Sequence, residues 1–134
     1  MKANDLRVGN WINEFGIPKQ VMPLDILGLH QIEHANETCI DLIPISLTEE
    51  WLLKFGFEKY STICYHSQKW TLKNPILEKI KRTSEHFYIL KRKGKYQART
   101  RVQSDGIYLK TIQYVHQLQN LYFALTGEEL TLNK

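Results

Sequence analysis

The hydrophobic pattern is most regular near the end of the chain, where it predicts an amphipathic helix. Large apolar side chains recur there at the three- and four-residue spacing of one helix face: Val115, Leu118, Leu121, Tyr122 and Leu125. Gly127 follows at the position where a helix end needs a left-handed backbone, which glycine adopts without a Cβ penalty. A single helix of this length is marginal in water, so we expect it to pack on the preceding sheet.

A second, shorter helix is predicted near the middle of the chain, with a signal at each end. Thr48 is a suitable N-cap, and Glu49 and Glu50 place negative charge in the first turn. Ser46 with Glu49 also matches a capping box, so two starting positions remain open. Gly56 closes the helix. Its apolar face consists of Trp51, Leu52 and Phe55. We expect this helix to cover one end of an N-terminal sheet.

Short apolar runs in the first third of the chain predict that sheet. Leu6, Val8 and Ile12 fall on one side of an extended segment, which ends in a turn at residues 15–18. Further strands are expected at 19–28, where Pro23 marks an edge or a bulge, at 29–33 and at 38–43. Strands this short and this closely spaced are typical of a strongly bent antiparallel sheet or an SH3-like barrel.

Two glycine-containing turns predict an antiparallel meander over residues 86–113. Lys93-Gly94 and Asp105-Gly106 match two-residue hairpin turns, which gives strands at 86–92, 95–104 and 107–113. Two more strands are expected before the meander, at 59–66 and 69–73. Between them and the meander, Asn74-Pro75 leaves residues 74–82 open between a helical turn and a strand, with the strand favoured.

These elements predict an α+β fold. It would contain a small bent antiparallel sheet or SH3-like barrel, a short capped helix, an antiparallel β-meander, and a C-terminal amphipathic helix packed on the sheet. The expected division is into residues 1–57 and 58–134, or a single domain over 1–134. A chain of 134 residues accommodates either.

The two turns also sort the meander side chains between two faces, because loop length sets the register and alternate residues point to opposite sides. In the predicted register Val102 lies opposite Leu109, and Arg101 lies opposite Lys110. One face is apolar and would receive the C-terminal helix: Phe87, Ile89, Ala98, Thr100, Val102, Ile107 and Leu109. The other face mixes cations with aromatic rings: Tyr88, Leu90, Arg92, Lys95, Gln97, Arg99, Arg101, Tyr108, Lys110 and Ile112.

Charge is concentrated in this same region. The formal net charge is +4, and residues 76–110 hold ten basic and three acidic side chains, whereas the rest of the chain is net acidic. Such asymmetry is typical of a protein with an anionic partner, although basic surface also maintains solubility. The candidate nucleic-acid-binding residues are Tyr88, Arg92, Lys95, Arg99, Arg101, Tyr108 and Lys110.

Three interpretations of the mixed face remain open. Phosphates would neutralise like-charged neighbours such as Arg101 and Lys110, while tyrosine rings stack on bases. Alternatively, long basic side chains simply cover a sheet that faces solvent. Leu90 and Ile112 favour a third interpretation, in which a protein partner or a second copy of the chain covers the face.

Motifs for other chemistry are lacking. The sequence contains no P-loop, no Gly-x-Gly-x-x-Gly, no Gly-x-Ser-x-Gly and no His-Glu-x-x-His, so no cofactor or small-molecule ligand is predicted and an enzyme is disfavoured. The spacing of the histidines and cysteines matches no structural zinc site: His30, His34, Cys39, Cys64 and His66. We expect no membrane span and no signal peptide, and therefore a cytoplasmic protein with reduced thiols.

Segments at both ends of the chain resemble a family of small uncharacterised proteins from gut bacteria and their prophages or mobile elements. The similar segments are Leu6–Ile12, Ile45–Phe57 with the motif LTEEWLLKFGF, and Tyr114–Leu130 with the motif YVHQLQNLYFALTGEEL. The resemblance implies an intracellular accessory protein of phage origin, and no site residues. With it, the leading hypothesis is a non-catalytic protein-interaction module. The alternative is a nucleic-acid-binding accessory protein, and the weakest is an enzyme.

Overall fold

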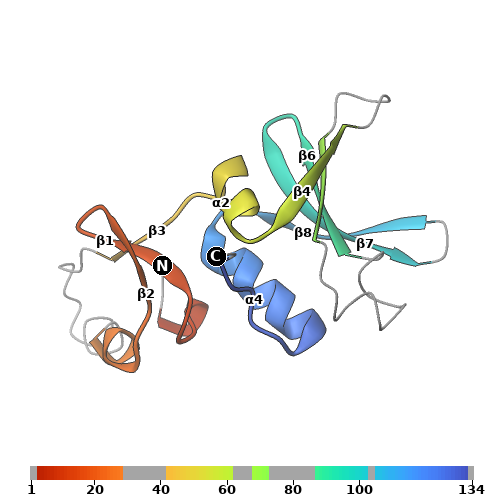
Figure 1. Ribbon diagram of the computed structural model, residues 1–134. Helices are drawn as coiled ribbons and strands as arrows, with labels where there is room; N and C mark the ends of the chain where they lie inside the picture. The colour runs from red at the N-terminus through yellow and green to blue at the C-terminus, as the bar shows by residue number, and fades with distance from the viewer. Residues whose placement is uncertain (1–2, 29–41, 62–67, 73–86, 103–104, 133–134) are drawn as a thin grey trace. The chain divides into compact units, whose positions relative to one another are not determined.

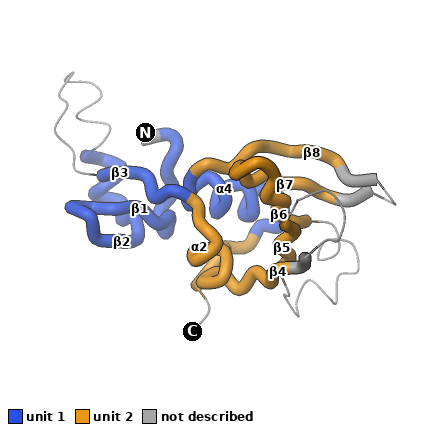
Figure 2. The backbone as a smooth tube through the Cα atoms, turned by 90° about the horizontal axis from the view of Figure 1, so that it is seen from above, with its two compact units in different colours: residues 1–46, 114–127 blue, residues 47–113, 128–134 orange. Residues whose placement is uncertain are grey.

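The computed structural model describes residues 3–28, 42–61, 68–72, 87–102 and 105–132. By their internal contacts they belong to two compact units, residues 1–46 with 114–127 and residues 47–113 with 128–134 (Figure 2). The first unit holds a three-stranded antiparallel sheet and the second a five-stranded one. The predicted α+β class is confirmed.

The sheet of the first unit is built around β1 (Trp11–Glu14), which pairs antiparallel with β2 (Ile17–Gln20) and with β3 (Leu42–Pro44) (Figure 1). A 3-10 turn, η1 (Ala3–Asp5), precedes it. Phe15 and Gly16 between β1 and β2 both have positive φ, as a type I′ hairpin turn requires. Among the described residues this is a small antiparallel sheet, as the sequence predicts for this part of the chain.

Three details of the N-terminal prediction are wrong or lie outside the described residues. Leu6 and Ile12 are buried as expected, but Val8 is exposed and residues 6–10 form no strand. The strand expected at 19–28 stops at Gln20, and residues 23–28 are helical. The strand at 29–33 and most of that at 38–43 fall outside the described part of the chain.

The helix at 23–28 has signals that a strand interpretation overlooks. Pro23 takes the first helical position, where its missing N–H has no intrahelical partner to lose. The Asp25 carboxylate accepts a hydrogen bond of 2.8 Å from the Met22 N–H just before the helix. That bond is one half of a capping box, so Pro23 starts a helix here and does not mark a strand edge.

The C-terminal helix, α4 (Val115–Thr126), has the predicted ends. The Tyr114 N–H donates to the Gln117 side chain at 3.1 Å at its start, and Gly127 closes it with φ of 73°. Its buried residues are Val115, His116, Leu118, Gln119 and Tyr122. The buried face therefore includes a glutamine that the spacing argument placed off the apolar stripe, and it excludes Leu125, which is exposed.

Helix α4 belongs to the first unit, where it packs beside β1. Its Gln119 accepts a hydrogen bond of 2.8 Å from the Trp11 N–H and donates one of 3.2 Å to the Gly9 carbonyl. Asn120 adds a bond of 2.9 Å to the Asp5 carbonyl. The predicted packing of this helix on a sheet is confirmed for β1 of the first unit, where its polar side chains also pair with backbone groups of residues 5–11.

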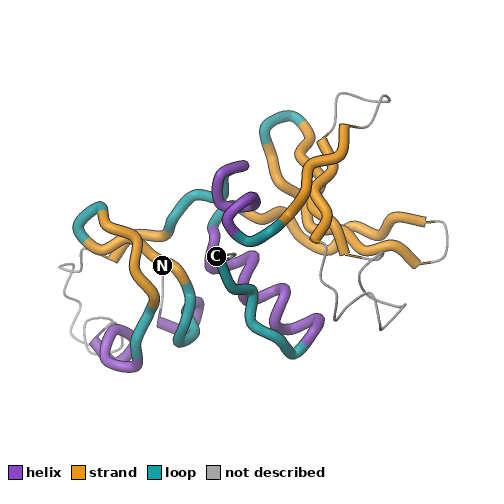
Figure 3. Tube along the Cα trace, in the orientation of Figure 1, coloured by secondary structure: helices purple, strands orange, loops and turns teal. Residues whose placement is uncertain are grey.

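The second unit contains the short helix α2 (Glu49–Lys54) and the five-stranded sheet (Figure 3). The Thr48 hydroxyl accepts from the Trp51 N–H at 3.4 Å, so Thr48 is the N-cap and the Ser46 alternative is excluded. Helix α2 contacts the adjacent strand β4 (Phe57–Ser61). Within the second unit it therefore packs with the larger sheet.

The strands of the larger sheet follow chain order. After β4 come β5 (Gln68–Leu72), β6 (Phe87–Arg92), β7 (Lys95–Val102) and β8 (Asp105–Ile112), each antiparallel to its neighbour. The predicted three-stranded meander corresponds to β6, β7 and β8 and is confirmed. Lys93 and Gly94 both have positive φ, as expected for the first turn. Residues 74–82 lie outside the described part of the chain.

The second turn is displaced from its predicted position. Val102 pairs with Asp105 and Arg101 with Gly106, so Asp105-Gly106 is not a turn but the beginning of β8. A β-bulge follows, in which Arg99 pairs with Tyr108 but Ala98 pairs with Lys110. Leu109 is therefore the extra residue of β8, and every later side chain of this strand changes face.

Burial of one side chain explains the displaced register. Because of the bulge, Ile112 pairs with Tyr96 and its exposed fraction is 1 %. In the regular register predicted from Asp105-Gly106, Ile112 would lie on the polar face. The core face of the sheet instead carries a buried set from all five strands: Phe57, Trp70, Ile89, Tyr96, Ala98 and Ile112.

Candidate nucleic-acid interface

One row of side chains crosses the sheet on the face opposite this core. Thr71 of β5 pairs with Tyr88, Tyr88 with Arg99, and Arg99 with Tyr108. We call this side of the sheet the basic face. By strand register it carries Glu58, Lys69, Thr71, Tyr88, Leu90, Arg92, Lys95, Gln97, Arg99, Tyr108 and Thr111.

The bulge in β8 shapes this face. Tyr108 and Thr111 are three residues apart and would lie on opposite sides of a regular strand. With Leu109 as an extra residue they lie on the same side, and their hydroxyls are 2.9 Å apart. β-Bulges commonly re-aim side chains at sheet edges, and β8 is an edge strand. Here the bulge fixes the tyrosine next to Arg99.

Three cations of the basic face have no acidic partner among the described residues. Arg92 and Lys95 are directly opposite each other and exposed, while Arg99 is half-buried. Within the described part of the chain none of the three forms an ion pair, and Arg99 Nε is buried without a hydrogen-bond partner. A buried N–H group without a partner costs free energy, so an anion that reaches Arg99 would be favoured.

Lysines on the core side of the same sheet are neutralised instead. Glu49 of α2 lies 3.0 Å from Lys91 Nζ and 3.7 Å from Lys59 Nζ. The hydrogen bond from Lys91 lowers the pKa of the Glu49 carboxyl below its ordinary value, and the same bond raises the pKa of Lys91. Glu49 therefore compensates two of the lysines on the core side of the sheet.

Replacing Glu49 with glutamine is expected to reduce stability only where the carboxyl is ionised. Its pKa is lowered on folding, so its contribution is complete above the ordinary value of 4.5 and is lost as pH falls through the lower folded value. The Glu49 side chain is 37 % exposed, so the loss at neutral pH should be about 0.5 kcal/mol. Urea unfolding at pH 7 and pH 3 measures it. Equal losses at both pH values would contradict this account, and the more exposed Glu50→Gln is the matched control.

The structure separates the residues that the sequence grouped on this face. Arg92, Lys95, Arg99, Tyr88 and Tyr108 share it. Lys110 pairs with Ala98 on the core side of the bulge, and Ile112 is buried there as well, so both are removed from the face. For Arg101 the structure gives only the backbone pairing with Gly106.

The two tyrosines of the basic face differ in how much of the side chain is exposed to a ligand. Tyr88 is only 9 % exposed, and Lys69 Nζ lies 4.6 Å from the centre of its ring. Tyr108 is 50 % exposed. Sequence reasoning missed Lys69, because no short turn links β5 to β6 and hairpin length alone could not set their register. The expectation that both rings are available for stacking therefore holds for Tyr108 only.

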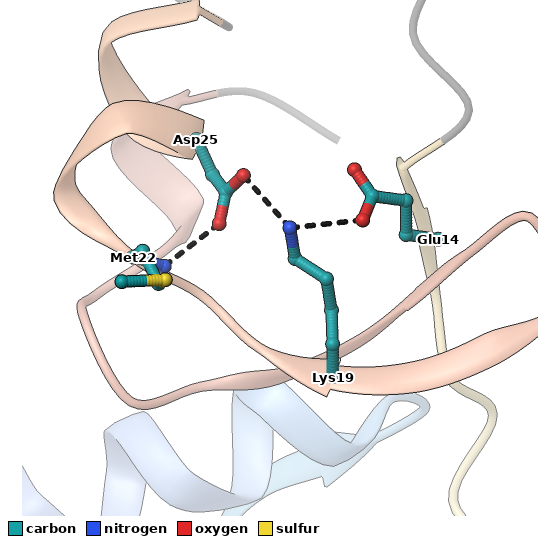
Figure 4. A network of polar contacts seen from close by, with 4 residues as sticks. All are labelled: Glu14, Lys19, Met22 and Asp25. Atoms are coloured by element: carbon teal, nitrogen blue, oxygen red, sulfur yellow. Dashed lines mark hydrogen bonds and ion pairs between the residues drawn. The ribbon is translucent and has the colours of Figure 1, made fainter.

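The first unit contains a polar network of a different kind, shown in Figure 4. Lys19 Nζ lies 2.9 Å from Asp25 and 3.0 Å from Glu14, and its hydrogen bond with Asp25 raises its pKa. Burial acts to raise the pKa of Asp25, but the hydrogen bonds from Met22 and Lys19 outweigh it, and this pKa is lowered. The network joins β1, β2 and the helix at 23–28, and its single cation is compensated by two carboxylates.

The net charge, counted over the full sequence, also differs between the two compact units. Residues 47–113 and 128–134 carry 15 basic and 8 acidic side chains, a net charge of +7. Residues 1–46 and 114–127 carry 3 basic and 6 acidic side chains, a net charge of −3. The unit that contains the basic face is therefore the one attractive to polyanions.

The described residues show no features of a metal site or of a membrane-spanning helix. They contain no group of three or more histidine, cysteine, aspartate or glutamate side chains that could hold a metal ion, and no helix long and apolar enough to cross a membrane. The candidate metal ligands considered above all lie outside these ranges: His30, His34, Cys39, Cys64 and His66. Within the described ranges, His116 is buried and stacks on Tyr114 with ring centres 5.8 Å apart.

Comparison with known proteins supplies no further assignment. No family model matches the chain, and no curated protein and no solved structure gives a significant match.

Proposed function

We propose that the protein is a non-catalytic binding module whose basic face binds nucleic acid. The observation that carries the proposal is the distribution of ion pairs in the second unit. Two lysines on the core side are matched by Glu49, whereas Arg92, Lys95 and Arg99 have no acidic partner among the described residues. A phosphate backbone would supply the missing negative charge.

The spacing of these cations suits a repeating anion. Arg92 and Lys95 form a directly opposed like-charge pair, which is destabilising without a counter-ion. Arg99 lies four residues farther along β7, about 13 Å away at ~3.3 Å per residue. A chain of phosphates could contact both positions at once, whereas a single small anion could reach only one.

Burial of Ile112 changes the balance between the two leading hypotheses. From the sequence, Leu90 and Ile112 together favoured a protein partner on this face. Ile112 lies in the core and Leu90 is half-buried, so the basic face has lost the apolar surface on which a protein contact would depend. Polar and cationic groups remain, and they favour nucleic acid.

A protein-interaction role has a specific observation in its favour elsewhere. The first unit exposes large apolar side chains in the β1–β2 turn and in the helix that follows: Phe15, Ile17, Met22, Leu24 and Leu27. Exposed apolar groups of this kind are typical of protein contacts when they adjoin one another. A partner bound there would be retained when Arg99 is replaced, which distinguishes this second candidate from the first.

The cellular setting is part of the proposal. Resemblance to small proteins of prophages and mobile elements favours an accessory role in nucleic-acid transactions of such an element. The expectation of a cytoplasmic location follows from the same resemblance and from the low cysteine content.

Fluorescence anisotropy with a labelled single-stranded oligonucleotide of about 20 nucleotides tests the proposal. Arg99→Ala and Arg92→Ala/Lys95→Ala should each weaken binding several-fold, because each removes contacts to phosphate. Lys54→Ala is the matched control, since it removes one positive charge from α2, where Lys54 pairs with Glu50.

Two results would refute the proposal. One is the absence of binding by the unmodified protein at low salt. The other is an equal loss of affinity in Lys54→Ala and Arg99→Ala, which would show that net charge matters and the basic face does not.

A further inference from the structure

The exposed ring of Tyr108 gives the basic face a feature that phosphate binding does not need. Its hydroxyl lies 2.9 Å from the Thr111 hydroxyl, which restrains the ring, and half of the side chain is accessible to solvent. Holding a large aromatic side chain exposed in one orientation leaves apolar area in water. A flat partner stacked on that ring would remove this apolar area from water.

Arg99 is the immediate neighbour of this ring across the strands. Its guanidinium is planar and always charged, so it can bind a phosphate through two parallel hydrogen bonds or stack on a base. A ring and a planar cation side by side match the two parts of one nucleotide, its base and its phosphate. Tyr88 completes the row but is nearly covered, so the row offers one stacking position and not two.

We infer that the basic face binds unpaired bases in preference to duplex, with Tyr108 as the stacking surface and Arg99 on the adjoining phosphate. This inference rests on the proposed nucleic-acid binding and adds the class of substrate. In a duplex the flat sides of the bases are covered by their neighbours, and a sheet face reaches only the backbone. In a single strand every base has an accessible flat side, so stacking on Tyr108 tolerates any sequence.

The β-bulge is the structural basis of this selectivity. Without the extra residue Leu109, Thr111 would lie on the opposite side of β8 from Tyr108 and could not restrain its hydroxyl. The bulge also removes Lys110 from the face, which takes one point charge away from the ring. What remains around Tyr108 is a stacking position beside one arginine.

The test compares labelled single-stranded and duplex oligonucleotides of about 20 nucleotides at one low salt concentration. Tyr108→Ala should lower the affinity for the single strand by about 5- to 100-fold and leave the duplex affinity within about twofold. Tyr108→Phe keeps the ring and should stay within about threefold of the unmodified protein for both. Ile107→Ala is the control, since Ile107 is a partly exposed neighbour on the other side of β8.

Each other outcome overturns the inference in a recognisable way. If Tyr108→Ala binds single strands as well as the unmodified protein does, or loses both substrates equally, the ring is not a stacking surface, while the proposed nucleic-acid binding still stands. If Tyr108→Phe is as weak as Tyr108→Ala, the hydroxyl and not the ring is responsible. If the unmodified protein binds neither substrate, the proposed function fails together with the inference.

Discussion

Replacing Gln119 with alanine is expected to lower the free energy of unfolding by about 3 kcal/mol. This side chain is 1 % exposed, and it accepts from the Trp11 N–H and donates to the Gly9 carbonyl. The Gly9 carbonyl keeps a second partner in Gln20, but the Trp11 N–H loses a bond at a site closed to water. The missing amide group also leaves a cavity beside β1. Urea unfolding followed by circular dichroism measures the loss.

Gln117 provides the comparison within the same helix. Gln117→Ala removes one hydrogen bond at the start of α4, and a loss of about 0.5–1 kcal/mol is expected. If Gln119 lay off the buried face, as the spacing of apolar residues indicated, its replacement would cost no more than that of Gln117. Equal effects of the two substitutions would therefore contradict the packing of α4 beside β1.

Replacing Ile112 with lysine should be the more damaging of two adjacent substitutions in β8. Ile112 is 1 % exposed opposite Tyr96, so Ile112→Lys would bury an ammonium group without a partner. A loss of about 3–5 kcal/mol is expected, which is enough to unfold many small domains. The midpoint of urea or thermal unfolding is the measurement.

Thr111→Lys is the matched substitution, because Thr111 is exposed on the opposite face of the same strand. It removes only the contact with the Tyr108 hydroxyl, and a change within about 0.5 kcal/mol is expected. A regular strand that turned at Asp105-Gly106 predicts the reverse order, with Thr111 inward and Ile112 outward. A larger loss for Thr111→Lys would contradict the bulge and the register derived from it.

The sequence predicts helix ends and tight turns correctly where the signal lies within a few residues of the feature. Thr48 and Gly56 bound α2, Gly127 ends α4, and Lys93-Gly94 closes the first hairpin, because each of these depends on local backbone conformation. The α+β class followed from the same local patterns.

The hydrophobic pattern does not determine which distant segments of the chain pack against each other. A helix with one apolar stripe can pack on any apolar surface, so the stripe alone does not identify the packing partner of α2 or of α4. The partner of α4 depends on Gln119 and the backbone between Gly9 and Trp11, which hydrophobic spacing does not register. The helix at 23–28 is not predicted from the sequence, because a proline can mark a strand edge or a bulge as well as the first position of a helix.

The candidate site was predictable to the extent that alternation along one hairpin determines it. Tyr88, Arg92, Lys95 and Arg99 share a face because the β6–β7 turn was identified correctly. Lys110 and Ile112 were misplaced because a β-bulge has no clear signal in the sequence, and the strong turn dipeptide Asp105-Gly106 suggested a different register. That Arg92, Lys95 and Arg99 have no acidic partner among the described residues could be learned only from the structure.

Salt dependence of single-strand binding tests the central claim most directly. If Arg92, Lys95 and Arg99 each contact a phosphate, the logarithm of the association constant should fall linearly with the logarithm of salt concentration, with a slope of about −2. Arg99→Ala should reduce the magnitude of that slope by about 0.7, and Lys54→Ala should leave it unchanged. Binding that does not respond to salt, or a slope that Arg99→Ala does not alter, would contradict the assignment of the basic face as a nucleic-acid interface.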